Sequence, residues 1–164
     1  MAQGNIELLT PDSRAEIDTW IAKYPADQKQ SAVMAALRIA QEQNAGCLST
    51  ELMDAVAAYL DMPAMAVYEV ATFYSMYRLQ PVGRHEFNVC TNISCMLRGS
   101  DEIVAHLEKR LGIKLGETSA DGRFTLREVE CLGACVNAPV MRVARDYHEH
   151  LTPELIDRLL DGLE

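Results

Sequence analysis

Apolar residues recur every three or four positions through the first half of the chain, which is the periodicity of helices that bury one face. Ser13 and Glu16 have the spacing of a capping box. Gly46 is a typical helix stop, and Ser49 or Thr50 is a typical cap. We therefore predict an N-terminal helical bundle, packed as helical hairpins, with helices over about residues 13–24, 28–45, 50–60 and 63–74.

The last of these helices carries an aromatic and methionine-bearing region, 65–77. Helical spacing predicts that Val67, Val70, Ala71 and Tyr74 share its inward face. A charged residue substituted for Tyr74 is then expected to damage folding more than assembly with a partner. The same region is our sequence-based candidate for the surface that meets a partner.

The pattern changes at residues 80–83, where Gln-Pro-Val-Gly interrupts the helical periodicity. We place a domain boundary there, giving an N-terminal helical bundle over 1–82 and a second domain over 83–164. The second domain shows short apolar runs between helical patterns, in the order β-α-β, then β-β-α, which is the order of a thioredoxin-like domain. The predicted class is α/β (α+β), with strands at 87–89, 124–129, 140–144 and 147–151 and helices from Ser100 to Leu111 and from Thr152 onward.

The composition disfavours some classes of function. The chain of 164 residues is 49% hydrophobic and 24% charged, with a formal net charge of −9 and a pI of about 4.9. This acidity disfavours binding to a phosphate backbone, so we expect no nucleic-acid partner. No apolar run reaches the roughly 18 residues of a membrane span, and the first residues lack the pattern of a secretory or transit signal. We therefore expect a cytoplasmic protein with no direct membrane insertion.

Four of the five cysteines form two close pairs. Cys90-Thr-Asn-Ile-Ser-Cys95 and Cys131-Leu-Gly-Ala-Cys135 are separated by 35 residues, whereas Cys47 stands alone. In a reducing compartment such pairs bind metal or do redox work more often than they form disulfides. A [2Fe–2S] cluster has two irons that each need two protein ligands, so each pair is a candidate for one iron. Backbone N–H groups at the small residues of the second loop are expected to approach the sulfurs.

Other chemistry remains open on spacing alone. A structural zinc site also takes four cysteines; it favours two residues, sometimes up to four, between paired ligands, so the spacings of four and three here do not exclude it. A zinc-stabilised interaction module is therefore an alternative, and a thiol oxidoreductase is a third, although its cysteines usually have two intervening residues. The sequence holds no phosphate-binding glycine loop, so we expect that this chain does not bind NADH or flavin by itself.

The cysteine pattern resembles that of a known family, the small [2Fe–2S] subunit (24-kDa type) of respiratory NADH:quinone oxidoreductase, or complex I. The resemblance covers nearly the whole chain from about residue 12. One local departure is Gly46-Cys47-Leu48, where the family commonly has an aromatic residue after the glycine. The supporting matches are Val70-Ala-Thr-Phe-Tyr-Ser75, Gln80-Pro-Val-Gly-Arg-His85, Asp121-Gly-Arg-Phe124 and His150-Leu-Thr-Pro-Glu154.

The resemblance implies a helical bundle joined to a thioredoxin-like [2Fe–2S] ferredoxin domain. It implies that Cys90, Cys95, Cys131 and Cys135 ligate one cluster, with no complete active site on this chain. It also implies a larger partner subunit that binds FMN and NADH, other peripheral-arm subunits, and attachment to the inner (cytoplasmic) membrane through the complex. Similar subunits occur in NAD-linked hydrogenases and formate dehydrogenases, and the Gln80 and His150 segments favour complex I over these.

Overall fold

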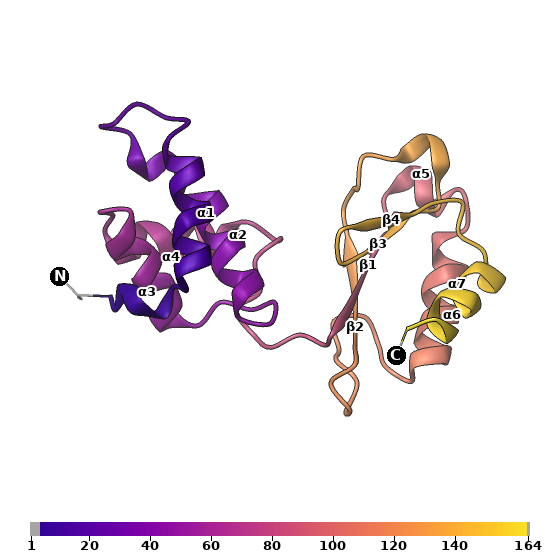
Figure 1. Cartoon of the computed structure of the whole chain (residues 1–164). Helices are drawn as coiled ribbons and strands as arrows, with labels where there is room; N and C mark the ends of the chain where they lie inside the picture. The colour runs from indigo at the N-terminus through magenta and orange to yellow at the C-terminus, as the bar shows by residue number, and fades with distance from the viewer. Residues whose placement is uncertain (1–3, 164) are drawn as a thin grey trace. The chain divides into compact units, whose positions relative to one another are not determined.

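The computed structural model describes residues 4–163 and divides the chain into two compact units (Figure 1). The first unit ends at Pro81 and the second begins at Val82. Each unit has a hydrophobic core of its own. An all-helical unit followed by a unit that combines a sheet with helices confirms the predicted fold class.

The first unit holds the four predicted helices. The Ser49 hydroxyl accepts a hydrogen bond from the Leu52 amide at 3.2 Å, so Ser49 is the cap of the third helix, as the sequence predicts. Pro63, predicted to be the first residue of the fourth helix, is its N-cap residue, and the helix begins at Ala64. The helices are α1 (Pro11–Ile21), α2 (Val33–Gln43), α3 (Thr50–Tyr59) and α4 (Ala64–Phe73), with short 3-10 helices at Ile6–Leu8 and Lys29–Ala32.

Two helix starts differ from the prediction. The cap of α1 is Thr10, whose hydroxyl accepts from the Ser13 amide at 3.1 Å, and Pro11 occupies the first helical position. The predicted capping box at Ser13 is therefore wrong, because Ser13 already lies in the first turn. The segment predicted to begin near residue 28 opens with the 3-10 helix Lys29–Ala32, and α2 begins only at Val33.

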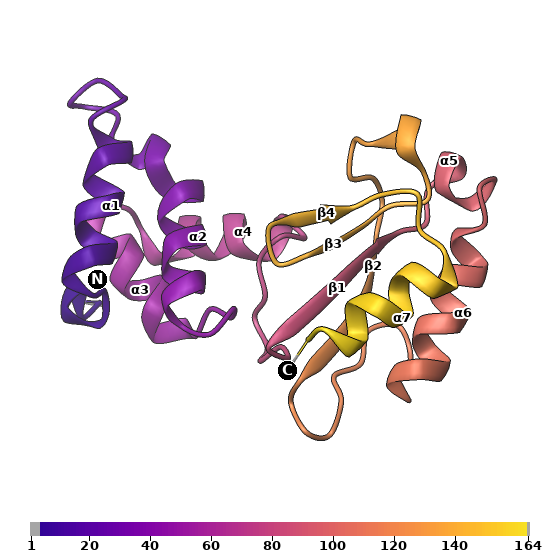
Figure 2. The ribbon, with the colours of Figure 1, turned by 45° about the vertical axis from the view of Figure 1, so that its right-hand side comes forward.

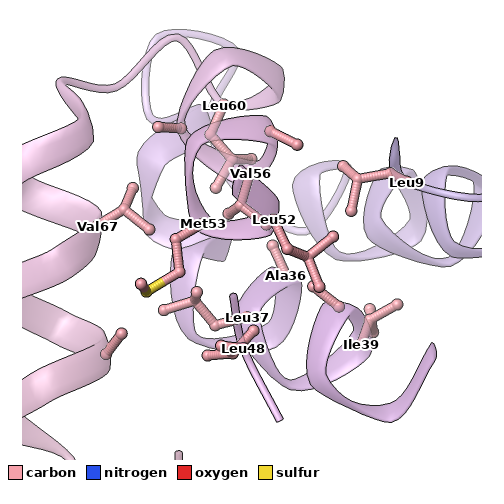
Figure 3. Close-up of a cluster of buried hydrophobic side chains, with 14 of the residues drawn as sticks. Leu9, Ala36, Leu37, Ile39, Leu48, Leu52, Met53, Val56, Leu60 and Val67 are labelled. Carbon is pink, nitrogen blue, oxygen red and sulfur yellow. The ribbon is translucent and has the colours of Figure 1, made fainter. Parts of the chain in front are cut away.

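All four helices contribute to the core of the first unit, with Ile17 coming from α1 and Leu9 from the segment before it. Figure 3 shows part of this core. Ala36, Ala40 and Ala55 are fully buried, and side chains this small let the helices approach closely. The larger side chains that fill the remaining space include Leu37, Leu48, Leu52, Met53, Val56, Leu60 and Val67.

The prediction that Tyr74 faces inward is wrong. Tyr74 follows the end of α4 and is 39% exposed, with its ring edge-on to Phe73 at 5.1 Å between centroids. The chain leaves helical geometry at Tyr74, so helical spacing no longer applies there. The expectation that a charge at Tyr74 would mainly damage folding loses its basis. Val67 and Ala71 are buried as predicted.

The second unit is a four-stranded sheet with helices. Its elements are β1 (His85–Cys90), α5 (Ile93–Met96), α6 (Ser100–Leu111), β2 (Phe124–Val129), β3 (Met141–Val143), β4 (Asp146–His148) and α7 (Pro153–Asp161). The spatial order of the strands is β2-β1-β3-β4 (Figure 2). β1 and β2 are parallel, whereas β3 and β4 are antiparallel to their neighbours.

Alternation along the strands gives the sheet two different faces. Phe87 and Val89 of β1, with Leu126 of β2 and Met141 of β3, pack against Leu107 of α6. Both α6 and α7 contribute to this core, so they cover one face of the sheet (Figure 1). The alternate residues of the strands lie on the other face, which we call the open face, although Asn88, Cys90 and Thr125 on this face are buried.

Predicted boundaries in this unit hold where local signals are strong. Gly112 ends α6 with a left-handed φ of 67°, and Thr152 caps α7 by accepting from the Leu155 amide at 3.2 Å. Strands β3 and β4 are shorter than predicted. Ala144 turns the chain with φ 52°, and His150 has φ 49°, which ends the extended segment before Leu151.

Within residues 4–163, every helix is too short or too polar to cross a bilayer.

We predict that Leu107→Ala lowers the free energy of unfolding of the second unit by about 2–5 kcal/mol, because it removes a fully buried side chain between α6 and the sheet. Leu97→Ala is the matched control. Its side chain is 78% exposed in the same unit, and the change should be within about 0.5 kcal/mol. Denaturant unfolding followed by circular dichroism measures both, and equal effects would contradict the assigned core.

Candidate metal centre

The first cysteine pair lies where β1 meets α5. Cys90 is the last residue of β1, and its amide donates to the Val140 carbonyl at 3.0 Å. Cys95 lies within α5, a single helical turn that Asn92 caps by accepting from the Ile93 amide at 2.7 Å. The sequence shows no helical periodicity here and predicts a loop from Cys90 to Cys95; that prediction is wrong in its second half. The helical turn fixes the direction of the Cys95 side chain.

The second cysteine pair lies beyond the end of β2. The Sγ atoms of Cys131 and Cys135 are 3.9 Å apart. Gly133 lies between them with φ 78°, a left-handed conformation that side chains rarely adopt. Its amide donates to the Cys131 sulfur at 3.3 Å. The approach of a backbone N–H to a sulfur in this loop confirms the sequence-based expectation.

Parallel pairing of β1 with β2 brings the two pairs to one edge of the sheet. Cys90 is opposite Val129 in the register, so the chain leaves both strands at neighbouring points. Cys90 and Cys95 pack with Ala138 in a small apolar cluster, and Leu132 from the second cysteine loop packs against it. The Cys90 thiol also donates to the Glu130 carbonyl at 3.6 Å.

The pairs differ in burial. Cys90 and Cys95 are each 2% exposed, whereas Cys131 and Cys135 are exposed. Burial raises the pKa of the Cys95 thiol to about 11, and its hydrogen bond with Cys90 acts in the same direction. A nearby cation is therefore needed to stabilise the Cys95 thiolate, and a bound metal supplies one.

Strand β4 holds the second cysteine loop. The Tyr147 hydroxyl donates to the Leu132 carbonyl at 3.1 Å. After the loop, the Asn137 side chain donates to Glu149 at 2.7 Å, and the Asn137 carbonyl accepts from the His150 amide at 2.8 Å. The loop that carries the exposed cysteines is thus tied to the β3–β4 hairpin on both sides.

The four sulfurs form two pairs and not one tight cluster. Over residues 4–163, no three His, Cys, Asp or Glu side chains lie close enough together to hold one metal ion. A tetrahedral zinc site needs four ligands around one point, whereas a two-iron cluster needs two ligands at each end. Cys47 belongs to the first unit, where its thiol contacts the Asn44 carbonyl at 3.7 Å.

Exposed apolar side chains surround the cysteines. Ile93, Met96 and Leu97 lie on or next to α5, and Val136 directly follows Cys135. Tyr147 of β4 contacts the second cysteine loop through its hydrogen bond to Leu132. We call these five exposed side chains the cysteine rim. Val136 is 86% exposed although it directly follows Cys135. Large apolar groups that gather on a surface mark interaction sites.

Sequence reasoning misses two parts of this site. The one-turn helix α5 has an Asn cap as its only local signal, because a helix of four residues shows no periodicity. The sequence pattern assigns Tyr147 only to a hairpin strand, since its contact with Leu132 spans 15 positions and has no signature in the sequence.

Comparisons with known proteins agree with this geometry. A family described as thioredoxin-like [2Fe-2S] ferredoxin matches residues 17–164. The chain is 52% identical over 141 residues to an NADH-quinone oxidoreductase subunit of Rickettsia felis, covering 86% of this chain and 84% of the relative. It is 44% identical over 155 residues to the mitochondrial NADH dehydrogenase [ubiquinone] flavoprotein 2 of Dictyostelium discoideum, covering 94% of this chain and 63% of that protein.

Among solved structures, an NAD+-reducing [NiFe]-hydrogenase in the air-oxidized state superposes with a TM-score of 0.69. The match covers 80% of this chain but only 22% of the hydrogenase chain, at 21% sequence identity. At that identity the likeness concerns the fold alone.

We predict that Tyr147→Phe loosens the second cysteine loop, because it removes the hydrogen bond to the Leu132 carbonyl. A lost hydrogen bond of about 0.5–1.5 kcal/mol corresponds to about two- to tenfold faster local opening. Amide hydrogen exchange over residues 131–137 measures this. Tyr24→Phe, in the first unit, is the control and should leave exchange in the loop unchanged. Equal protection in wild type and Tyr147→Phe would show that the hydrogen bond to Leu132 does not hold the loop.

Proposed function

The chain belongs to the thioredoxin-like [2Fe-2S] ferredoxin family, and from this premise we propose that it is the [2Fe–2S] electron-transfer subunit of an NADH-quinone oxidoreductase. Membership in the family implies one [2Fe–2S] cluster. The relatives named as NADH-quinone oxidoreductase subunits, about half identical over most of their length, support the assignment to that complex.

The observation that carries the proposal is the arrangement of the cysteines as two pairs at one edge of the sheet. Four thiols without a further carboxylate or imidazole ligand suit an iron–sulfur cluster. Cys90 and Cys95 are the ligands of one iron, and Cys131 and Cys135 are the ligands of the other. When bound, the cluster accepts and releases one electron at a time.

The residues of this chain make one side of the site buried and the other side accessible. Cys90 and Cys95 are buried against the sheet and exclude water from one side. Cys131 and Cys135 lie at the surface, where a redox partner can approach. The Gly133 amide donates to the Cys131 sulfur and stabilises negative charge there. Electrons therefore enter and leave on the side of the second cysteine loop.

The cysteine rim is the surface that meets the partner in this proposal. A partner subunit that binds FMN and oxidises NADH covers these apolar side chains and brings the flavin close to Cys131 and Cys135. Catalysis needs both subunits, because this chain has no nucleotide-binding loop in its sequence. The complex, with its other peripheral-arm subunits, holds the chain at the cytoplasmic face of the inner membrane.

A second candidate is the equivalent subunit of an NAD-linked hydrogenase or formate dehydrogenase. The shared fold with the NAD+-reducing [NiFe]-hydrogenase supports it. The relatives at about 50% identity favour the quinone-linked complex.

We predict that anaerobically purified protein contains two irons and two acid-labile sulfides per chain and gives a rhombic EPR signal after reduction by dithionite. Cys131→Ala should abolish the normal spectrum because one iron loses a ligand. Cys47→Ala is the matched control and should keep the full signal, since Cys47 lies outside the site. Stoichiometric zinc without an EPR signal would instead establish the interaction module.

We predict that Leu97→Gln weakens co-purification with the flavin subunit by at least tenfold while the cluster spectrum and the thermal midpoint stay unchanged. Leu97 is 78% exposed, so only its contact with a partner is lost. Met65→Gln, which is 65% exposed on α4, is the control and tests the region 65–77 at the same time. Loss of binding in Met65→Gln alone would show that the partner binds the helical unit and not the cysteine rim.

A further inference from the structure

A row of polar side chains crosses the open face of the sheet one step away from the cysteines. In the strand register Asn88 of β1 lies between Arg127 of β2 and Arg142 of β3, and Arg142 is opposite Tyr147 of β4. Their neighbours along the strands, such as Val89 and Met141, pack on the helix-covered face. Alternation therefore puts the whole row on the open face, together with Cys90.

Arg142 stands out in this row. Its Nε is buried and has no hydrogen-bond partner within the described part of the chain, residues 4–163. A guanidinium group stays charged at all physiological pH values, and desolvating a charged donor without a partner is costly. An orphaned atom of this kind indicates a negative group that lies nearby in the working protein.

The neighbouring carboxylates are engaged elsewhere. Glu149 would lie diagonally across from Arg142, but it accepts from the Asn137 side chain at 2.7 Å. Glu86, on the other side of the row, pairs with Arg127 at 4.0 Å. The chain thus holds the carboxylates of the open face away from the Nε of Arg142.

The cysteine site lies close to Arg142. The β1–β3 register continues to Cys90 opposite Val140, and the Cys90 amide donates to the Val140 carbonyl at 3.0 Å. Arg142 is therefore the diagonal neighbour of Cys90 on the same face, and diagonal neighbours lie about 7–8 Å apart, within reach of a long side chain. Tyr147, opposite Arg142, donates to the Leu132 carbonyl in the second cysteine loop, so the row is also connected to the second cysteine pair.

We propose that Arg142 is a positioning residue whose charge stabilises the extra electron on the reduced cluster and so raises its reduction potential. The inference rests on the ligand set proposed above. Four thiolates around two ferric irons and two sulfides carry two negative charges, and reduction by one electron adds a third. A fixed cation on the Cys90 side favours the more negative state.

The other charges near the site act in the opposite direction. Glu130 directly precedes Cys131, and the Glu128 carboxylate lies 3.4 Å from the Thr91 hydroxyl, next to Cys90. Both carboxylates disfavour added negative charge on the cluster. Arg142 offsets them, and within residues 4–163 it forms no ion pair that would neutralise its own charge.

The test is an EPR-monitored redox titration of the cluster-loaded full chain. We expect Arg142→Gln and Arg142→Met to lower the ratio of reduced to oxidised cluster about tenfold at a fixed ambient potential, which is about 59 mV for a one-electron couple. Arg142→Lys keeps the charge and should change the ratio by less than about threefold. Arg127→Gln is the matched control; it removes an arginine already paired with Glu86 and should also change the ratio by less than about threefold.

Each outcome decides the proposal. An unchanged potential in both neutral variants, or an equal shift in Arg127→Gln, overturns the role of Arg142. If the neutral variants load no cluster and Arg142→Lys does, the charge is needed to hold the anionic cluster, which supports the role. Failure of all three variants to load would show that Arg142 acts through packing and overturns it. A wild-type protein that binds no [2Fe–2S] cluster would instead refute the proposed function itself.

Discussion

Two strands that run parallel and in register end at the same edge of a sheet, and in this chain that geometry brings distant cysteines together. Cys90 ends β1 opposite Val129, so Cys131 emerges beside it although the two are far apart in sequence. A parallel pair needs a crossover of a dozen or more residues, which α6 supplies. Burial of α6 on the sheet therefore fixes the register, and the register fixes the cysteine site.

Unequal burial of the two pairs follows from the same topology. Cys90 belongs to a central strand and packs with Cys95 of α5 and with Ala138, so this pair is enclosed by protein. Cys131 and Cys135 lie in a loop beyond the edge strand β2, and both side chains are exposed there. The enclosed pair limits solvent on one side, and the loop leaves a short path to the surface on the other. A site for electron transfer needs both properties.

Local chemistry explains which parts of the fold the sequence reveals. Ser49, Gly112 and Thr152 mark helix ends because a cap or a left-handed glycine acts on its own few residues. Ser13 is misleading because Thr10 and Pro11 form a better helix start. The cysteine spacing is enough to nominate all four ligands, whereas α5 is too short to show a pattern. Which residues lie beside the cysteines depends on long-range strand pairing, which spacing does not encode.

Arg142 illustrates that last limit. In the sequence it is one polar residue between two apolar ones, the usual pattern of a strand with one solvated face. A role beside the cysteines can be inferred only from the structure. There the register puts Arg142 diagonal to Cys90, and its Nε is buried without a partner among residues 4–163. A chain with a net charge of −9 has carboxylates available to pair with such a group. Because Glu149 and Glu86 are held by other residues, the charge of Arg142 remains available to the cysteine site.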